Sequence, residues 1–183
     1  MGLMERFSFW RRGDATLRSW VGARFAEATG GMVNRLAAVM MTSRQSGDVP
    51  WSPLTKPLSE CSLAVVTTAG LHLAGDRPFD VDSAQGYPSF RSFPSESDHA
   101  DLRIAHTHFS RRYYDGDPNV ILPLDGLRKL ADSDVLHLAP RFFSFGYAGT
   151  LTRELVDPER GTAPRLAAEL HDDGVDLALL VPA

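Results

Sequence analysis

Residues 62–80, SLAVVTTAGLHLAGDRPFD, decide the fold of this chain. The stretch opens with an apolar run, LAVV, which is typical of a strand buried on both faces of a sheet. It becomes polar at Thr67 and Thr68, reaches Gly70 and continues to His72. Because α/β proteins build their sites at the carboxyl ends of buried strands, these residues are the first candidates for a site.

The polar end of this stretch has two interpretations. The hydroxyl and backbone N–H groups around Thr67, Thr68 and Gly70 could bind an anion such as a substrate carboxylate. The same residues could instead form a plain turn between a strand and a loop. The stretch has neither the glycines of a GxGxxG dinucleotide motif nor the GK[ST] of a P-loop, so it matches no common phosphate-binding motif.

The sequence DLRIAHTH, which ends at His108, is the sharpest local cluster of chemical groups. It reads as a second strand, and side chains repeat every second residue along a strand, so His106 and His108 should project to one side. The pair could be metal ligands, a base with its partner, or an anion clamp. A metal site needs a third ligand, for which His72, Asp115 or Asp117 is available. We predict acid–base or orienting roles for the three histidines, and no metal.

Three further residues carry groups that could take part in binding or catalysis. Asn119 could face the same mouth of the sheet and bind substrate, or could satisfy the backbone of a turn. Ser144 lacks a surrounding GxSxG elbow, which disfavours a hydrolase nucleophile. Cys61 directly precedes the first strand and is expected to be a buried, inert thiol.

The rest of the chain alternates strand and helix signals. Leucines at helical spacing follow Pro123, a strand is expected over 135–139, a helix carries Leu166 and Leu170, and a last buried strand covers 175–181. Strand, helix and strand in succession are typical of a parallel sheet covered by helices. We therefore predict an α/β fold: a three-layer, Rossmann-like parallel-sheet domain over 49–183, incomplete at its C-terminus.

Residues 1–48 form a separate region by composition. Apolar residues recur there at helical spacing in two runs, and a proline-rich linker, SGDVPWSPLTKP, follows. The first run comprises Leu17, Trp20, Val21, Phe25 and Ala28, and the second Met32, Val33, Leu36, Ala37, Met40 and Met41. We expect a helical N-terminal extension that packs on the domain or on a second subunit. Twin arginines at 11–12 are weak evidence for a targeting signal, because charged residues interrupt the apolar segment that follows.

Composition excludes several classes of partner. The 183 residues carry a formal net charge of −4, which gives no electrostatic case for nucleic acid or an anionic membrane. No apolar run approaches the roughly 20 residues of a membrane span. A single cysteine rules out an internal disulfide framework and a cysteine metal cluster within the chain, and it fits a reducing, cytoplasmic location.

These motifs, in this order and spacing, resemble the selenoprotein B family of glycine, betaine, sarcosine and D-proline reductases. The resemblance covers about residues 49–183. It is carried by VPWSPL (49–54), KPLSE (56–60), VVTTAGLH (65–72), PFD (78–80), SFR (89–91), LRIAH (102–106), residues 117–127, AP (139–140), FSFGY (143–147), DGVD (173–176) and LLVP (179–182).

The resemblance implies reductive cleavage of a carbon–nitrogen bond alpha to a carboxylate in a small amino acid. In the family a selenolate or thiolate attacks the alpha carbon while a pyruvoyl group on a partner subunit holds the amine. The selenocysteine or cysteine motif follows the strand that matches residues 175–182, so the nucleophile is expected just after Ala183. This chain itself carries no cofactor on this interpretation, and it is expected to be oligomeric and inactive alone.

Two points stay open at the level of sequence. We expect that the reading frame was ended at a UGA codon for selenocysteine, although a natural end of the domain is the alternative. Where the family has an acidic residue near the paired polar positions, this chain has His106 to Ser110, which leaves the substrate open. The other functions considered are a metal-dependent hydrolase using His106, His108 and His72, and a non-catalytic subunit that only binds its partner.

Overall fold

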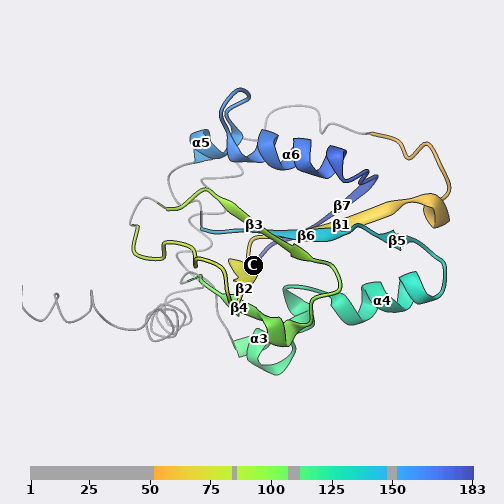
Figure 1. Cartoon of the computed structure of the whole chain (residues 1–183), viewed down its shortest axis with the longest axis horizontal. Helices are drawn as coiled ribbons and strands as arrows, with labels where there is room; N and C mark the ends of the chain where they lie inside the picture. Colours follow the sequence, from red (N-terminus) through yellow and green to blue (C-terminus); the bar gives the residue numbers. More distant parts are fainter. Residues whose placement is uncertain (1–51, 84–85, 107–111, 148–151) are drawn as a thin grey trace, which may run out of the picture.

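The computed structural model of the chain describes residues 52–83, 86–106, 112–147 and 152–183 (Figure 1). The strands are β1 (Ser62–Thr67), β2 (Leu71–Leu73), β3 (Phe90–Pro94), β4 (Leu102–Ile104), β5 (His137–Leu138), β6 (Arg141–Phe145) and β7 (Leu177–Val181). The helices are α3 (Arg112–Gly116), α4 (Leu124–Asp132), α5 (Thr152–Val156) and α6 (Thr162–Asp172), with short 3-10 turns η1 (Leu58–Glu60), η2 (His99–Asp101) and η3 (Pro118–Val120).

Strand β1 is the centre of the main sheet, as its sequence predicts. Ala64 and Val65 are fully buried and Val66 is nearly so, because both faces of the strand are covered. On one side β1 pairs in parallel with β7, and on the other side it pairs in parallel with β5 at its start and β6 at its end. β5 and β6 are separated by Pro140, which has no N–H with which to continue a ladder.

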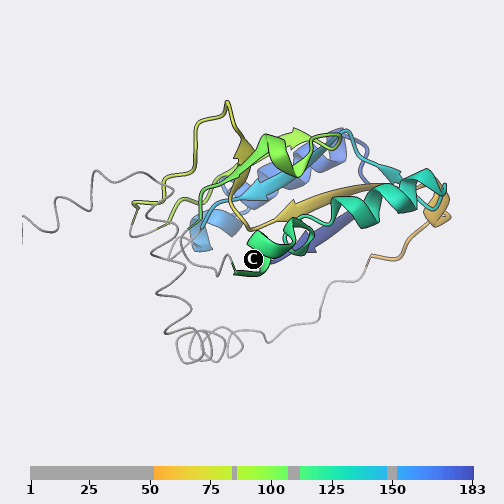
Figure 2. The same cartoon turned by 90° about the horizontal axis from the view of Figure 1, so that it is seen from below.

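The sheet is mixed rather than purely parallel, which corrects the expectation from sequence. Strand β3 pairs with β6 in the antiparallel direction, from Phe90 opposite Phe145 to Pro94 opposite Arg141. Helix α6 lies on one face of the sheet and α4 on the other (Figure 1). The chain therefore has α/β character, with β3 at one edge of the described sheet and β7 at the other (Figure 2). The Rossmann-like, three-layer class itself remains a prediction.

The strand predicted over 101–108 is shorter than expected and lies outside the main sheet. Its described part is β4, which ends at Ile104 and pairs with β2 in a separate antiparallel ribbon. The chain leaves the ladder just after Ala105, whose N–H donates to the Gly70 carbonyl at 2.9 Å. The alternation that placed His106 and His108 on one strand face is therefore wrong for His106, which follows the strand.

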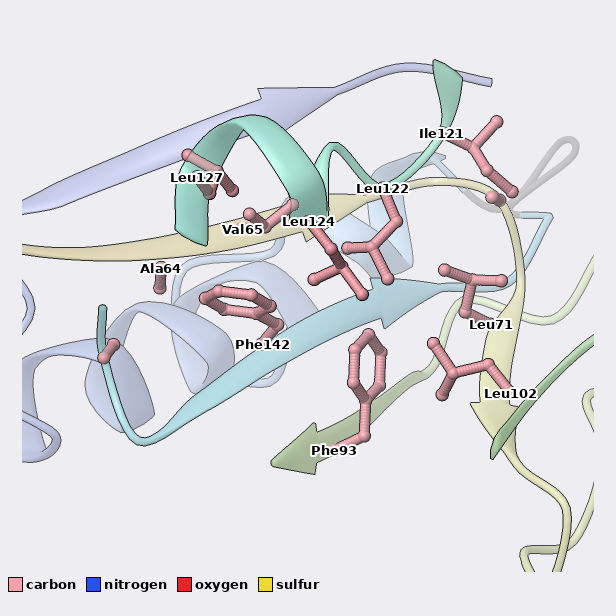
Figure 3. Packing of buried hydrophobic residues seen from close by; sticks show 12 residues of the cluster. Ala64, Val65, Leu71, Phe93, Leu102, Ile121, Leu122, Leu124, Leu127 and Phe142 are labelled. Carbon is pink, nitrogen blue, oxygen red and sulfur yellow. The ribbon is translucent and has the colours of Figure 1, made fainter. Parts of the chain in front are cut away.

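The core joins the main sheet to this ribbon. Figure 3 shows Val65 and Phe142 from the sheet meeting Leu124 and Leu127 of α4, with Leu71 of β2 completing the contact. A second, smaller cluster on the other face packs Val66 and Phe143 against Leu166 of α6. Packing on both faces holds the carboxyl ends of β1 and β6 in fixed positions.

The predicted N-terminal extension falls wholly outside the described residues, and the predicted linker SGDVPWSPLTKP falls partly outside them. The N-terminal extension over 1–48 lies outside them, so the domain boundary stays a prediction. Within the part of the chain that the structure describes, no helix is long and apolar enough to cross a membrane. The predicted strands over 135–139 and 175–181 are found as β5 and β7, each shorter by a few residues. The prediction that the last strand is buried is wrong for the described structure, because β7 lies at the edge of the sheet and Leu180 is 70% exposed.

Candidate functional site

The carboxyl ends of β1 and β7 meet at Thr68. Its backbone N–H donates to the carbonyl of Val181 at 3.1 Å, and its side-chain oxygen accepts from the N–H of Ala183 at 2.9 Å. Thr68 is exposed, whereas Thr67 beside it is fully buried. The Thr68 hydroxyl, which the sequence predicted at this edge of the sheet, is thus at the surface. The residues that follow β7 lie directly against it.

Backbone N–H groups from 68 to 71 are all used inside the protein. Ala69 donates to the Thr67 hydroxyl at 3.3 Å, and Gly70 donates to the carbonyl of Phe145 at 2.9 Å. Leu71 donates to the buried hydroxyl of Ser144 at 2.7 Å. An anion could take these donors only by displacing the bonds they now make. Anion binding by Thr67, Thr68 and Gly70 stays a prediction. Because the backbone N–H groups are already used, such binding would depend on the exposed side-chain hydroxyl of Thr68.

Gly70 makes the turn possible. Its φ is +67°, a left-handed conformation that side chains rarely adopt, and a Cβ there would overlap the carbonyl oxygen of Ala105. The same Cβ would lie 3.3 Å from the Cβ of His106. The absence of a side chain at Gly70 therefore lets the β2–β4 ribbon approach closely and places His106 beside the end of β1.

His72 is buried on β2. Its Nδ1 lies 2.8 Å from the carbonyl oxygen of Leu73, so Nδ1 carries a proton and donates it there. Its ring stands edge-on to Phe79, with the centroids 6.4 Å apart. These two contacts fix the tautomer and the orientation of the ring, and they leave Nε2 as the atom for any acid–base role.

His106 reaches the same aromatic surface from the other side. It is 5% exposed and stands edge-on to Tyr147 at a centroid distance of 5.8 Å. Tyr147 follows Gly146, where a Cβ would overlap the ring of Phe79, so the Phe79 ring lies against this backbone. His72 and His106 are therefore both brought to the segment that follows β6. His108 lies outside the described residues.

Arg91 is a residue that reasoning from sequence missed. Its guanidinium carbon lies 4.6 Å from the centre of the Phe79 ring, on the ring that His72 also contacts. The Nε atom donates to the carbonyl of Arg77 at 3.2 Å and one terminal nitrogen donates to Phe90 and Ser89, which locks the side chain. The only signal in the sequence is its place in the SFR motif over 89–91.

Asn119 is held in a capping arrangement before α4. Its Nδ2 donates to Asp117 at 3.0 Å and to Asp125 at 2.9 Å, and its Oδ1 accepts from the Asp125 N–H at 3.0 Å. The backbone N–H and side-chain amide of Asn119 both donate to Asp117, and these bonds lower the pKa of that carboxyl group. A role in substrate binding stays a prediction, and it would require Asn119 to exchange these partners.

Two other kinds of site concern the described residues: a metal site and a surface groove. Among residues 52–83, 86–106, 112–147 and 152–183, no three His, Cys, Asp or Glu side chains lie close enough to hold a metal ion. An open groove of about 450 Å³ lies at the opposite, amino edge of the sheet. It is lined by Ser95, Glu96, Asp98, Arg128, Ala131, Asp132 and Leu138.

That groove is not favoured as the active site. Arg128 within it already donates to Asp98 at 2.7 Å and to the carbonyls of Glu96 and Ser97 at 3.1 Å. Ligands of α/β proteins bind outside the carboxyl ends of the strands, which is the edge that holds Thr68. We therefore keep the carboxyl edge as the candidate site.

Comparison with known proteins decides the family. Residues 37–183 match the family described as glycine/sarcosine/betaine reductase selenoprotein B. The chain belongs to the selenoprotein B family. The match includes β1, β7 and every candidate residue discussed above, which confirms the resemblance inferred from the motifs.

Two curated relatives agree with this assignment. The chain is 31% identical over 131 residues to the D-proline reductase subunit gamma of Acetoanaerobium sticklandii, covering 71% of this chain and 52% of that protein. It is 29% identical over 136 residues to the sarcosine reductase complex component B subunit beta of Peptoclostridium acidaminophilum, covering 72% of this chain and 30% of that protein. The chain therefore spans about half, or less, of the length of these selenoprotein B relatives. No solved structure gives a significant match.

Proposed function

We propose that this chain is part of a selenoprotein B-type reductase that cleaves a carbon–nitrogen bond alpha to a carboxylate in a small amino acid. The family match over residues 37–183 is the observation that carries the proposal. The named relatives are a D-proline reductase subunit and a subunit of a sarcosine reductase complex, which supports reductase chemistry carried out with partner subunits. Glycine, betaine, sarcosine and D-proline are the substrates to be tested.

The nucleophile of this reaction is proposed to come from outside these 183 residues. The single cysteine, Cys61, is fully buried at the amino end of β1, and its Sγ lies 3.3 Å from the carbonyl of Pro57. A thiol there is at the wrong end of the strand for a site at Thr68 and is not accessible to a substrate. A selenocysteine or cysteine next to residue 183 would instead be close to the Thr68 hydroxyl, because the backbone N–H of Ala183 donates a hydrogen bond to that hydroxyl.

Within this chain, Arg91 is proposed to bind the substrate carboxylate. Its guanidinium is always charged, it is held by three carbonyl or hydroxyl partners, and it lies against the ring that orients His72. His72 and His106 are proposed to orient the substrate amine or to move a proton at Nε2 of His72. A pyruvoyl group on a partner subunit would supply the electrophile for the amine of glycine, sarcosine or D-proline, whereas the quaternary nitrogen of betaine is already positively charged and needs no such group. Both the selenol and this group remain proposals.

Binding of substrates to the purified chain tests this arrangement without the missing nucleophile. Sarcosine, betaine and D-proline should each perturb the NMR signals of Arg91 or stabilise the fold, whereas the corresponding amides, in which an uncharged carboxamide replaces the carboxylate, should not. Arg91→Met should abolish the difference in binding between each amino acid and its amide, while Arg103→Met should keep that difference. Arg103 is the matched control because it is an exposed arginine on β4 bonded to carbonyl oxygens.

Turnover tests the function itself. The chain alone should show no thiol-dependent cleavage of the carbon–nitrogen bond of any of the four substrates, measured as release of ammonia or amine or, for D-proline, as ring opening to 5-aminopentanoate. The complete protein, expressed together with its partner subunits, should show it. Turnover by the 183 residues alone would contradict the proposed external nucleophile, and no turnover by the complete assembly on any of these substrates would contradict the proposed reaction.

A further inference from the structure

An uncovered apolar surface lies at the edge of the main sheet. Strand β7, Leu177–Val181, has the sequence LALLV, and it pairs on one side with β1 and with no other strand among the described residues (Figure 2). Leu180 is 70% exposed and Leu179 is 37% exposed, although such a sequence is typical of a strand buried on both faces. An exposed apolar edge strand of this kind is normally covered by another element.

The surface around Leu180 continues onto α6. Leu180 stands opposite Val66 in the parallel register, so it lies on the face of the sheet that α6 covers. On α6, Arg165 contacts the ring of Phe90 and Glu169 bonds to Arg141, and both are on the β3 side. Positions 163 and 167, on the other flank of the helix, are both alanine. These alanines and Ala178 and Leu180 of β7 form a shallow apolar strip, which we call the β7 strip.

We propose that the β7 strip is the docking site of the chain's own residues 17–41. This segment carries apolar residues at helical spacing, including Trp20, Val21 and Phe25, so it has an apolar stripe that needs a partner surface. The strip offers small side chains on α6 beside a large one on β7, a surface on which a helix can pack closely. The proposal is independent of the reductase function.

The position of the linker selects this occupant. Lys56 bonds to Asp176 at 2.8 Å, and Asp176 directly precedes β7. The described chain therefore begins beside the amino end of the strip, shown as the orange segment in Figure 2. The chain between residues 41 and 56 can extend by at most about 50 Å, whereas β7 is only about 16 Å long. A tether of this length keeps the segment at high effective concentration near the strip, which favours it over a second copy.

The tryptophans provide a direct measurement. All three, Trp10, Trp20 and Trp51, lie within residues 1–51, so replacing Trp10 and Trp51 by phenylalanine leaves Trp20 as a reporter of the segment alone. If the segment docks, Trp20 emission should be blue-shifted and poorly quenched by acrylamide, and dilution should not change it. Leu180→Asp should shift the emission to the red and raise the quenching constant severalfold.

Val120→Asp is the matched control. Val120 is also an exposed apolar residue, at 48%, but it belongs to η3, which contacts α3 rather than the sheet edge. This variant should leave Trp20 unchanged. Leu180→Ala serves as a second variant, with a smaller shift in the same direction, if the aspartate prevents folding as judged by circular dichroism.

Three results would overturn the proposal. The first is a solvent-like emission of Trp20 in the parent protein. The second is an emission that neither Leu180 variant changes. The third is a blue shift that disappears on dilution together with a fall in sedimentation coefficient, because the occupant would then be a second copy of the chain.

Discussion

Replacing Gly70 by alanine tests whether the turn after β1 has the geometry described. Alanine would have to adopt the left-handed conformation, φ +67°, at a cost of about 1–2 kcal/mol. Its Cβ would also overlap the carbonyl oxygen of Ala105, and relief of that overlap would break the bond from the Ala105 N–H to Gly70, for about 1 kcal/mol more. Reduced entropy of the unfolded chain offsets about 0.4–1 kcal/mol of this loss.

The expected net loss in the free energy of unfolding is therefore about 2 kcal/mol, a large fraction of the ~5–15 kcal/mol of an ordinary domain. Gly75→Ala is the control, because a Cβ at Gly75 meets nothing within 4 Å and its φ is not left-handed. That variant should be neutral or stabilise the protein by up to about 0.5 kcal/mol.

Urea unfolding followed by far-ultraviolet circular dichroism is the suitable assay. Tryptophan fluorescence would report on residues 1–51 rather than on the sheet, because all three tryptophans lie there. The reasoning would be refuted if Gly70→Ala lost less than about 0.5 kcal/mol, or if Gly75→Ala lost as much as Gly70→Ala.

Three other variants follow from individual contacts. Ser144→Ala should cost about 1–3 kcal/mol in urea unfolding, because the buried Leu71 N–H loses its acceptor, and Ser144→Thr should cost less if its hydroxyl restores the bond. Asp176 has a lowered pKa because it accepts bonds from Lys56 and from a backbone N–H, so its stabilising effect is complete above its ordinary value of 3.8 and disappears as the pH falls through the folded value. Asp176→Asn should therefore lower stability at pH 7 and weaken the loss of stability on acidification, and an unchanged acid profile would contradict this. Arg141→Met should cost about 1 kcal/mol at low salt and less at high salt, since Arg141 bonds to two partly exposed carboxylates, and the same loss at both salt concentrations would count against an ionic contribution.

The family and the main elements could be read from the sequence because they depend on local patterns. The apolar run at 63–66 predicts a buried strand without any knowledge of its neighbours in the sheet. The leucines after Pro123 predict a short helix in the same way. The order of motifs along residues 49–183 was enough to indicate the selenoprotein B family, which the match over residues 37–183 confirms.

The candidate site was predicted less completely. Thr67, Thr68 and Gly70 were correctly assigned to the end of the first strand, and His72 was correctly placed just beyond it. Arg91 was missed because its contact with Phe79 joins strand β3 to the segment after β2, and no periodicity in the sequence encodes that approach. The strand placement of His106 was wrong because pairing with β2 ends once the chain passes Gly70.

The sequence by itself determined the buried central strand and the set of polar groups available at its end. Only the tertiary structure decided which of those groups are already bonded. The N–H of Leu71 is used by Ser144, far away along the chain, and the hydroxyl of Thr68 is met by Ala183. Such long-range partners depend on which strands become neighbours in the sheet, and local sequence patterns carry no information about that choice.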